Sequence, residues 1–420
     1  MTFVKSTVRF YRDELVLCAL ALPLGAAMGA LCALFGAVLR AVTEFREGHA
    51  LWLLPLLGLA GAAIVWCYGR FGRDCAKGMG LFFEAQQGRR EEIPLLLAPL
   101  VMASTWLTHL FGGSAGREGA AVQMGGALGS FLGRWLKDSQ ERKALMAAGM
   151  AAGFGGLFRT PLAAVFFGLE VFRCGRIEFS ALLPSLVSAF TASAVSGRLG
   201  VEKASFALPA NVELGLAGGG KLIVLCVIFS LIGVLFALLL KGARAALERV
   251  KLRPVLRTLI CGTAVGLLSL VCWGGRYSGL GENLIESSFA GQAQPWDFIL
   301  KALFTAVTLS AGFTGGEFTP LFSIGAAAGA ALAPLVGYPA GLCAALGYIA
   351  VFTSATNTFF TPLFISAEVF GARYLPLFAV ACAMAYILSG NISIYPHQYR
   401  GGKFGADESL FKTQSLTRQG

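Results

Sequence analysis

Charged residues are scarce in this chain of 420 residues. Only 14% of its residues are Asp, Glu, Lys or Arg, whereas 56% are hydrophobic. A soluble domain carries about 25% charged residues, and a large soluble enzyme would need far more polar surface. The composition therefore predicts an all-α, polytopic membrane protein. The 54 glycines agree with this prediction, because small residues let membrane helices pack closely.

Clusters of metal ligands and catalytic residues are also missing. The three histidines are isolated from one another, at His49, His109 and His397. The ten cysteines form no CxxC pair and lie mostly inside apolar runs, which is typical of small buried hydrophobes rather than of disulfides or metal ligands. We therefore expect no metal and no cofactor, and a membrane enzyme is disfavoured.

The net charge is +11, and the basic residues gather between apolar runs. This pattern is typical of the cytoplasmic loops of membrane proteins, so we expect no nucleic-acid partner. Residues 241–257 carry six Lys or Arg and one Glu, and we place this segment in a cytoplasmic loop. Lys5, Arg9 and Arg12 precede the first apolar run and place the amino end on the same side.

Several apolar runs are interrupted by glycine or proline. Some approach the ~20 residues of a full span, and others are shorter or resemble two consecutive elements. Broken segments survive at membrane depth only where they line a cavity, so we expect discontinuous and re-entrant helices. The chain divides into an N-terminal segment with the first membrane helix (1–48), a first membrane repeat (49–200), a second membrane repeat (201–396) and a short polar cytoplasmic tail (397–420).

An internal repeat supports this division. The segment Gly116–Gly125 aligns with Gly316–Gly325 at an offset of 200, and TPLAAVFFGLEVF at 160–172 resembles TPLFISAEVF at 361–370. Duplicated halves with interrupted helices are typical of secondary transporters, whose substrate site lies between the repeats. The alternative is that glycine-rich membrane helices resemble one another by composition alone.

The stretch GGSAGREGAAVQMGG at 112–126 places an ionised pair among glycines. At the amino end of a broken helix, unpaired backbone N–H groups and the helix dipole form an anion site. The carboxylate of Glu118 can occupy such a site when the ion is absent, and it loses that attraction when it is protonated. The alternative is an ordinary acidic residue in a first turn, with Arg117 as its solvated partner.

Three motifs resemble the CLC family of anion channels and proton-coupled anion exchangers: GREG at 116–119, RTPLA at 159–163 and GGEFTP at 315–320. The resemblance covers about residues 50–395. It implies a CLC-type inverted-repeat helical fold and a homodimer in which each subunit has its own anion pathway. It also implies that the gating glutamate of the family is Glu118.

Four positions depart from the chloride-transporting pattern of that family. Met79 replaces the serine that lines the inner anion site, Ala120 replaces the proline of GREGP, Thr319 follows the phenylalanine of GxFxP, and Val171 replaces the inner proton-relaying glutamate. These departures resemble the fluoride-exporting branch. The resemblance further implies that the inner tyrosine is Tyr395, with Tyr399 as the less favoured candidate.

Several groups are candidates for binding a small anion. Met79 has no hydrogen-bond donor, so the Thr319 hydroxyl, the Tyr395 phenol and backbone amides are the replacement donors, and Phe318 can present a positive ring edge. We expect Met79, Thr319, Tyr395 and Phe318 to lie in one cavity. The alternative for Met79 is a methionine that fills a gap in the core. The full set of anion-binding candidates is Gly78, Met79, Gly116, Arg117, Gly119, Phe318, Thr319 and Tyr395.

Glu317 is the second carboxylate of interest, since it precedes the phenylalanine that aligns with Glu118. It is a candidate proton-path residue in place of the missing inner glutamate, and the alternative is a capping acid. Glu170 and Glu368, which close the two repeats, are expected to cap or pair structurally.

These observations lead to one functional hypothesis. The chain is expected to export fluoride in exchange for protons across a bacterial inner membrane, with fluoride, protons, the lipid bilayer and a second copy of itself as partners and with both termini in the cytoplasm. The alternatives on the same fold are a chloride/proton exchanger and a passive chloride channel. A receptor-like or purely structural protein would not need Glu118 in a glycine-rich helix start.

Overall fold

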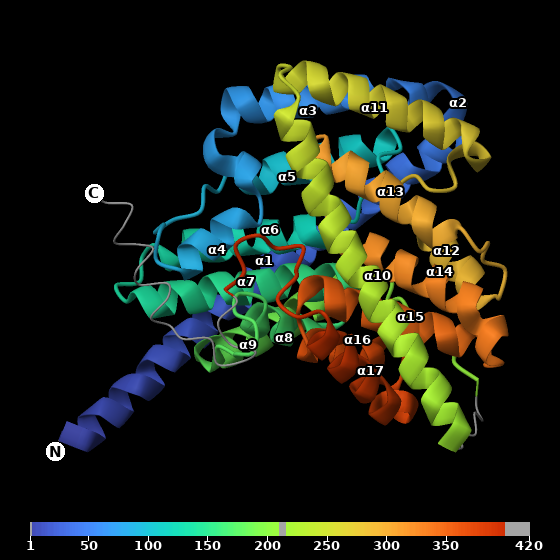
Figure 1. The fold of residues 1–420 in the computed structure, drawn as a ribbon. Helices are drawn as coiled ribbons and strands as arrows, with labels where there is room; N and C mark the ends of the chain where they lie inside the picture. The colour runs from blue at the N-terminus through green and yellow to red at the C-terminus, as the bar shows by residue number, and fades with distance from the viewer. Residues whose placement is uncertain (1, 210–215, 400–420) are drawn as a thin grey trace, which may run out of the picture.

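The computed structural model describes residues 2–209 and 216–399, and among these it contains helices but no β-strand (Figure 1). Most of the predicted tail at 397–420 lies outside the described residues. The helices are α1 (Thr2–Gly48), α2 (Ala50–Leu53), α3 (Leu57–Phe71), α4 (Gly80–Gln86), α5 (Leu97–Leu110), α6 (Glu118–Gly133), α7 (Ser139–Phe158), α8 (Pro161–Glu170), α9 (Leu182–Arg198), α10 (Leu216–Arg249), α11 (Pro254–Val271), α12 (Glu282–Phe289), α13 (Asp297–Ser310), α14 (Phe318–Val336), α15 (Ala340–Thr356), α16 (Phe360–Phe370) and α17 (Leu375–Leu388).

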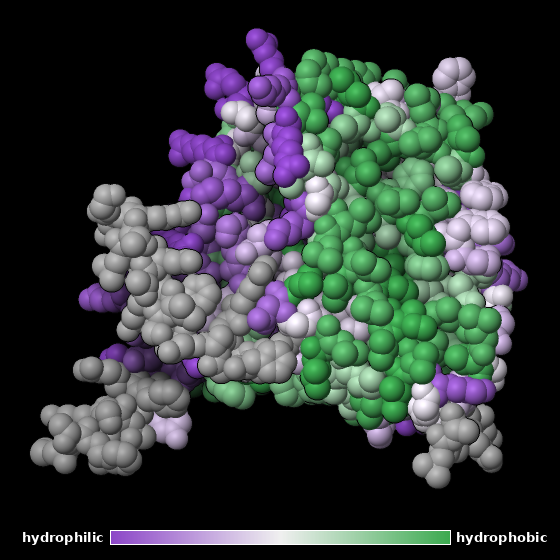
Figure 2. Space-filling view, viewed as in Figure 1, coloured by the Kyte–Doolittle hydropathy of each residue, from purple (hydrophilic) through white to green (hydrophobic). Residues whose placement is uncertain are grey.

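Six of the described helices are long and apolar enough to cross a membrane. A broad apolar surface covers the centre and right of Figure 2, over α10, α11 and α17, and hydrophilic residues gather along the left side. Large aliphatic side chains on α10 and α11 are about half exposed or more, among them Leu235, Leu268 and Val271. Such an exposed apolar surface marks contact with lipid rather than water, which confirms a polytopic membrane protein.

Two sets of five helices repeat in the same order, α5–α9 and α13–α17, on the left and right of Figure 1. Each set has a turn and an extended segment before its second helix, and the backbone states of 111–120 and 311–320 are the same residue by residue. The third helix of each set ends in a left-handed residue, Arg159 at φ 58° and Asn357 at φ 60°. The repeat predicted from the 200-residue offset is therefore present in the backbone.

The two repeats meet head to head. Gly116 and Gly316 form an antiparallel bridge in which each N–H donates to the other carbonyl, at 2.6 and 2.8 Å. The chain segments that enter α6 and α14 therefore run in opposite directions, as the inverted-repeat prediction requires. The two helices begin beside each other, at Glu118 and Phe318.

Short helices are capped across the repeats. The Glu170 carboxylate accepts the backbone N–H groups of Phe359, Phe360 and Thr361 at the start of α16, while the Glu368 carboxylate accepts those of Leu162 and Ala163 at the start of α8. These exchanges satisfy N–H groups that a helix leaves unpaired. The structural role expected for Glu170 and Glu368 is thus confirmed.

Glycines bring neighbouring helices into backbone contact in both repeats. A Cβ placed on Gly149 of α7 would lie 2.1 Å from the carbonyl oxygen of Gly125 of α6, and one on Gly347 of α15 would lie 2.0 Å from that of Gly325 of α14. Only a residue without a side chain fits at these crossings, which explains much of the high glycine content.

One expectation about the connections is wrong. Residues 241–257 were expected to form a loop, but α10 continues to Arg249 and α11 begins at Pro254, so only 250–253 connect them. The sequence ARAALER is rich in strong helix formers, and basic side chains at a helix carboxyl end are stabilised by the helix dipole. The basic residues therefore extend the helix instead of interrupting it.

The close helix contacts at glycines predict that two Gly→Ala substitutions change the stability of the protein very differently. Gly149→Ala should destabilise the folded protein by about 1–3 kcal/mol because its methyl group collides with backbone. Gly242→Ala, on α10 with open space around it, should be neutral or stabilising, since alanine favours a helix by roughly 0.5–1 kcal/mol. Thermal unfolding in detergent, followed by size-exclusion chromatography, measures both, and equal unfolding temperatures would contradict the packing argument.

Candidate functional site

The junction of the two repeats forms the centre of the site. A Cβ on Gly116 would lie 2.9 Å from the carbonyl oxygen of Gly316, and a Cβ on Gly119 would lie 2.9 Å from the Cα of Gly316. The glycines of the GREG motif therefore allow two helix amino ends to meet in backbone contact. The positive ends of both helix dipoles converge at this junction, and they favour an anion there.

The Glu118 side chain lies in this positive region. It is fully buried, and its Oε2 accepts a hydrogen bond from the hydroxyl of Thr319 in the opposite repeat. Its Oε1 has no hydrogen-bond partner among the described residues and lies 3.6 Å from Nε of Arg117. The carboxylate is therefore held by one hydrogen bond and one ion pair among the described residues.

Arg117 joins this carboxylate to a second one. Its Nη2 lies 3.1 Å from Oε1 of Glu282, at the start of α12. The Arg117 side chain is only 25% exposed, so it is not the solvated partner of an ordinary surface pair. This geometry disfavours the alternative in which Glu118 is a simple first-turn acid.

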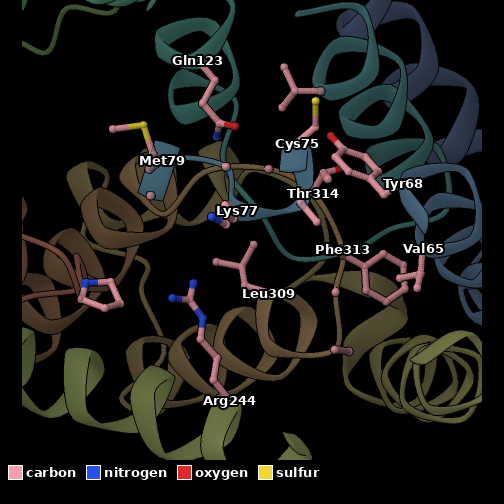
Figure 3. Close-up of a pocket in the computed structure, with 18 of the residues that line it drawn as sticks. Val65, Tyr68, Cys75, Lys77, Met79, Gln123, Arg244, Leu309, Phe313 and Thr314 are labelled. Atoms are coloured by element: carbon pink, nitrogen blue, oxygen red, sulfur yellow. The ribbon is translucent and has the colours of Figure 1, made fainter. Parts of the chain in front are cut away.

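Two cavities approach the junction from different sides. The cavity of about 680 Å³ that contains Met79 is called here the Met79 cavity (Figure 3). The cavity of about 610 Å³ that contains Glu118 is called the Glu118 cavity. Gly78, Met79, Glu317 and Tyr395 line the former, and Arg117, Glu118 and Thr319 line the latter.

The charges of the two cavities differ in sign. The Met79 cavity is lined by four Lys or Arg side chains and two carboxylates: Arg73, Lys77, Arg244, Arg257, Glu248 and Glu317. The Glu118 cavity is lined by three basic side chains and five carboxylates: Arg40, Arg117, Lys203, Glu44, Glu118, Glu202, Glu282 and Glu286. A cleft lined mainly by one sign of charge concentrates ions of the other sign, so the Met79 cavity favours anions and the Glu118 cavity favours cations, including protons.

The expectation of a single cavity is wrong. Thr319 lines the Glu118 cavity, Met79 and Tyr395 line the Met79 cavity, and Phe318 is among the lining residues of neither. Phe318 instead packs edge-on against three phenylalanine rings with centroids 5.1–5.5 Å away, those of Phe154, Phe167 and Phe352. Successive helix residues point about 100° apart, so Phe318 enters the core while Thr319 faces Glu118.

Tyr395 is buried and lines the Met79 cavity. Its side chain is 3% exposed, and its hydroxyl has no hydrogen-bond partner among the described residues. The ring packs against Phe83, with centroids 5.5 Å apart. Tyr399 instead pairs through its backbone with Phe172 and Cys174 and is not among the residues lining the Met79 cavity. The geometry therefore favours Tyr395 over Tyr399.

Glu317 faces the Met79 cavity rather than capping a helix. It is the N-cap residue of α14, yet its side chain makes no capping hydrogen bond. Its Oε1 accepts a hydrogen bond from Arg244 of α10 at 3.3 Å. The capping alternative is thus disfavoured, and a carboxylate paired with a cavity arginine remains a candidate proton-path residue.

Three residues of the site were not found from the sequence. In the sequence, Arg244 is one of several charges in a basic segment, and Gln123 is a single polar residue within a glycine-rich segment. Lys301 is fully buried and donates to Ser114 Oγ at 2.9 Å and to the carbonyl oxygen of Gly279 at 2.8 Å. Lys301 therefore anchors the loop that precedes the GREG motif. The one feature of the sequence that could have indicated this role is a single cationic residue inside an apolar run.

The fold and this site define a membrane protein of inverted repeats that meet at a buried carboxylate. A model of the voltage gated chloride channel family matches residues 60–390. The chain belongs to this family, the CLC family of anion channels and transporters.

Two relatives are similar to this chain along most of its length. A chloride/fluoride channel protein of Pseudomonas syringae pv. tomato is 38% identical over 381 residues, which cover 89% of this chain and 84% of that protein. A solved CLC-type fluoride/proton antiporter is 46% identical with a TM-score of 0.89, covering 91% of this chain and 98% of its own.

More distant relatives transport chloride. The H(+)/Cl(-) exchange transporter ClcA of Vibrio vulnificus is 27% identical over 293 residues, which cover 66% of this chain and 63% of that protein. The structure of a slow cyanobacterial Cl-/H+ antiporter has a TM-score of 0.78 at 22% identity, covering 96% of this chain and 98% of that one. At that identity the likeness concerns the fold alone.

The hydrogen bond between Thr319 and Glu118 predicts an energetic coupling across the repeats. In a double-mutant cycle, Thr319→Val and Glu118→Ala should each change the unfolding free energy, and the double variant should deviate from their sum by about 1–3 kcal/mol. Thermal or denaturant unfolding in detergent measures the cycle. Thr319→Ser, which retains the hydroxyl, is the matched control, and additive effects would contradict the pairing.

Proposed function

We propose that this protein exchanges fluoride for protons and exports fluoride from the cell. The observation that carries the proposal is the buried Glu118 carboxylate, which accepts the Thr319 hydroxyl where two helix amino ends meet. A carboxylate in an anion site competes with a transported anion for the same donors. Protonation removes its charge and its attraction to the helix dipoles. Proton binding and anion binding are thereby linked through one side chain.

The charges of the two cavities support a direction for each ion. Fluoride enters through the basic Met79 cavity, and protons reach Glu118 through the acidic Glu118 cavity. Arg244 and Arg257, which line the Met79 cavity, belong to the basic segment 241–257. By the positive-inside rule this side is cytoplasmic, so fluoride leaves the cell as protons enter.

The same reasoning orients the whole chain. Lys5, Arg9 and Arg12 precede the first apolar run, and the helix α4, which follows Met79, lies on the left of Figure 1, where hydrophilic residues gather in Figure 2. We therefore place the amino and carboxyl ends in the cytoplasm of a bacterium and the helices in its inner membrane. The functional unit is a homodimer in which each subunit, divided into repeats at 49–200 and 201–396, has its own pathway.

Fluoride is preferred to chloride for two reasons. Met79 lines its cavity without a hydroxyl, so a chloride site that depends on a serine is weakened. The relatives with the greater identity carry fluoride in their names, the Pseudomonas syringae protein and the fluoride/proton antiporter. Chloride/proton exchange is the second candidate, since the Vibrio vulnificus relative has that name, and a passive anion channel is the third.

Reconstituted liposomes test the proposal. With equal fluoride and chloride inside, fluoride should leave at least about ten-fold faster, because one hydrogen bond to an ion is worth roughly 1.5–3 kcal/mol. Ion-selective electrodes measure both effluxes, and a pH dye measures protons moving inward against their gradient. Protein-free liposomes are the control. Faster chloride efflux would favour the chloride exchanger, and fluoride efflux without proton movement would favour the channel.

A further inference from the structure

Gln123 is a buried polar side chain without a partner. Its side chain lies on α6 and the residue is 7% exposed, yet it makes no hydrogen bond with any described residue. It lies four residues after Gly119, so it occupies the same helix face one turn further along. In Figure 3 its carboxamide extends from the helix toward the segment that carries Met79.

The surroundings of Gln123 contain other unsatisfied donors. Gln123 lines the Met79 cavity together with Thr314 and Tyr395, and the hydroxyls of both have no hydrogen-bond partner among the described residues. A buried polar group without a partner costs about 1–3 kcal/mol, and native proteins keep few of them. Two such hydroxyls, with the carboxamide of Gln123 lining the same cavity, therefore suit a ligand that accepts hydrogen bonds.

The backbone beside Gln123 is shaped to leave it free. Gly78 has a left-handed φ of 51°, and a Cβ placed on it would lie 3.4 Å from Oε1 of Gln123. A larger residue at 78 would be strained by that φ, and its Cβ would contact the carboxamide. Because neither end of the carboxamide is hydrogen bonded, it can rotate to present its NH2 group to the cavity.

We propose that the carboxamide of Gln123 binds the transported anion in the Met79 cavity, together with the Tyr395 hydroxyl. This inference rests on the proposed function and identifies the donor that replaces the missing serine hydroxyl. The NH2 group supplies two donors and no charge. An uncharged donor holds the anion more weakly than a cationic side chain would, so the anion can be released toward the α6 amino end, as conduction requires.

Fluoride binding to the purified full-length protein tests this role. In isothermal titration calorimetry, Gln123→Met, which keeps length and removes the donors, should weaken fluoride binding at least about ten-fold. Gln123→Glu keeps the shape, removes the donors and adds negative charge, so it should weaken binding further. Gln123→Glu serves as the second variant if Gln123→Met does not fold.

The matched control is Gln398→Met. Gln398 is also a buried glutamine, but its carboxamide donates to the carbonyl oxygens of Val171 and Thr356, and it does not line the Met79 cavity. This variant should lose thermal stability and keep its fluoride affinity. If the wild-type protein binds fluoride, and Gln123→Met and Gln123→Glu bind it with affinities within two-fold of wild type, the role of Gln123 is refuted. The proposed function is then unaffected. A wild-type protein that binds no fluoride overturns the proposed function as well.

Discussion

The antiparallel backbone pair between Gly116 and Gly316 is the constraint on which the site depends. It holds the amino ends of α6 and α14 together inside the protein, where the partial positive charges of both helices add. Such a junction needs negative charge to be stable, because little water is present to solvate the unpaired N–H groups. The Glu118 side chain supplies that charge in this structure, and a small anion is the natural alternative occupant.

The number of hydrogen bonds separates a permanent carboxylate from a replaceable one. Glu170 also lies at a helix amino end, but it accepts three backbone N–H groups and the Thr361 hydroxyl. Glu118 accepts a single hydrogen bond from the described residues. Each hydrogen bond to a charged group is worth roughly 1.5–3 kcal/mol, so Glu170 is held more firmly as a cap than Glu118 is held at its junction. Two glutamates of the same repeat thus differ in role because of their surroundings.

Composition was sufficient to predict the fold class, and the 200-residue offset was sufficient to predict the inverted repeat. The candidate positions Glu118, Met79 and Tyr395 came from motifs that resemble those of the CLC family. These patterns could not predict the partition into two cavities, because it depends on the direction of neighbouring side chains at the start of α14. Arg244 and Gln123 were missed for a similar reason. A basic residue in a charged segment and a glutamine among glycines carry no signal until the fold places them at a cavity.

The proposed function requires that the Glu118 carboxylate and the transported anion compete for one site. Isothermal titration calorimetry of fluoride binding, in buffers that differ in ionisation enthalpy, measures the protons taken up per fluoride bound. Competition for one site predicts net proton uptake by the wild-type protein, with tighter fluoride binding at lower pH because protonated Glu118 vacates the site. It predicts no uptake in Glu118→Gln, which has no carboxyl group to protonate. If the wild-type protein binds fluoride without taking up protons, and with an affinity that does not depend on pH, the competition between Glu118 and the anion is refuted.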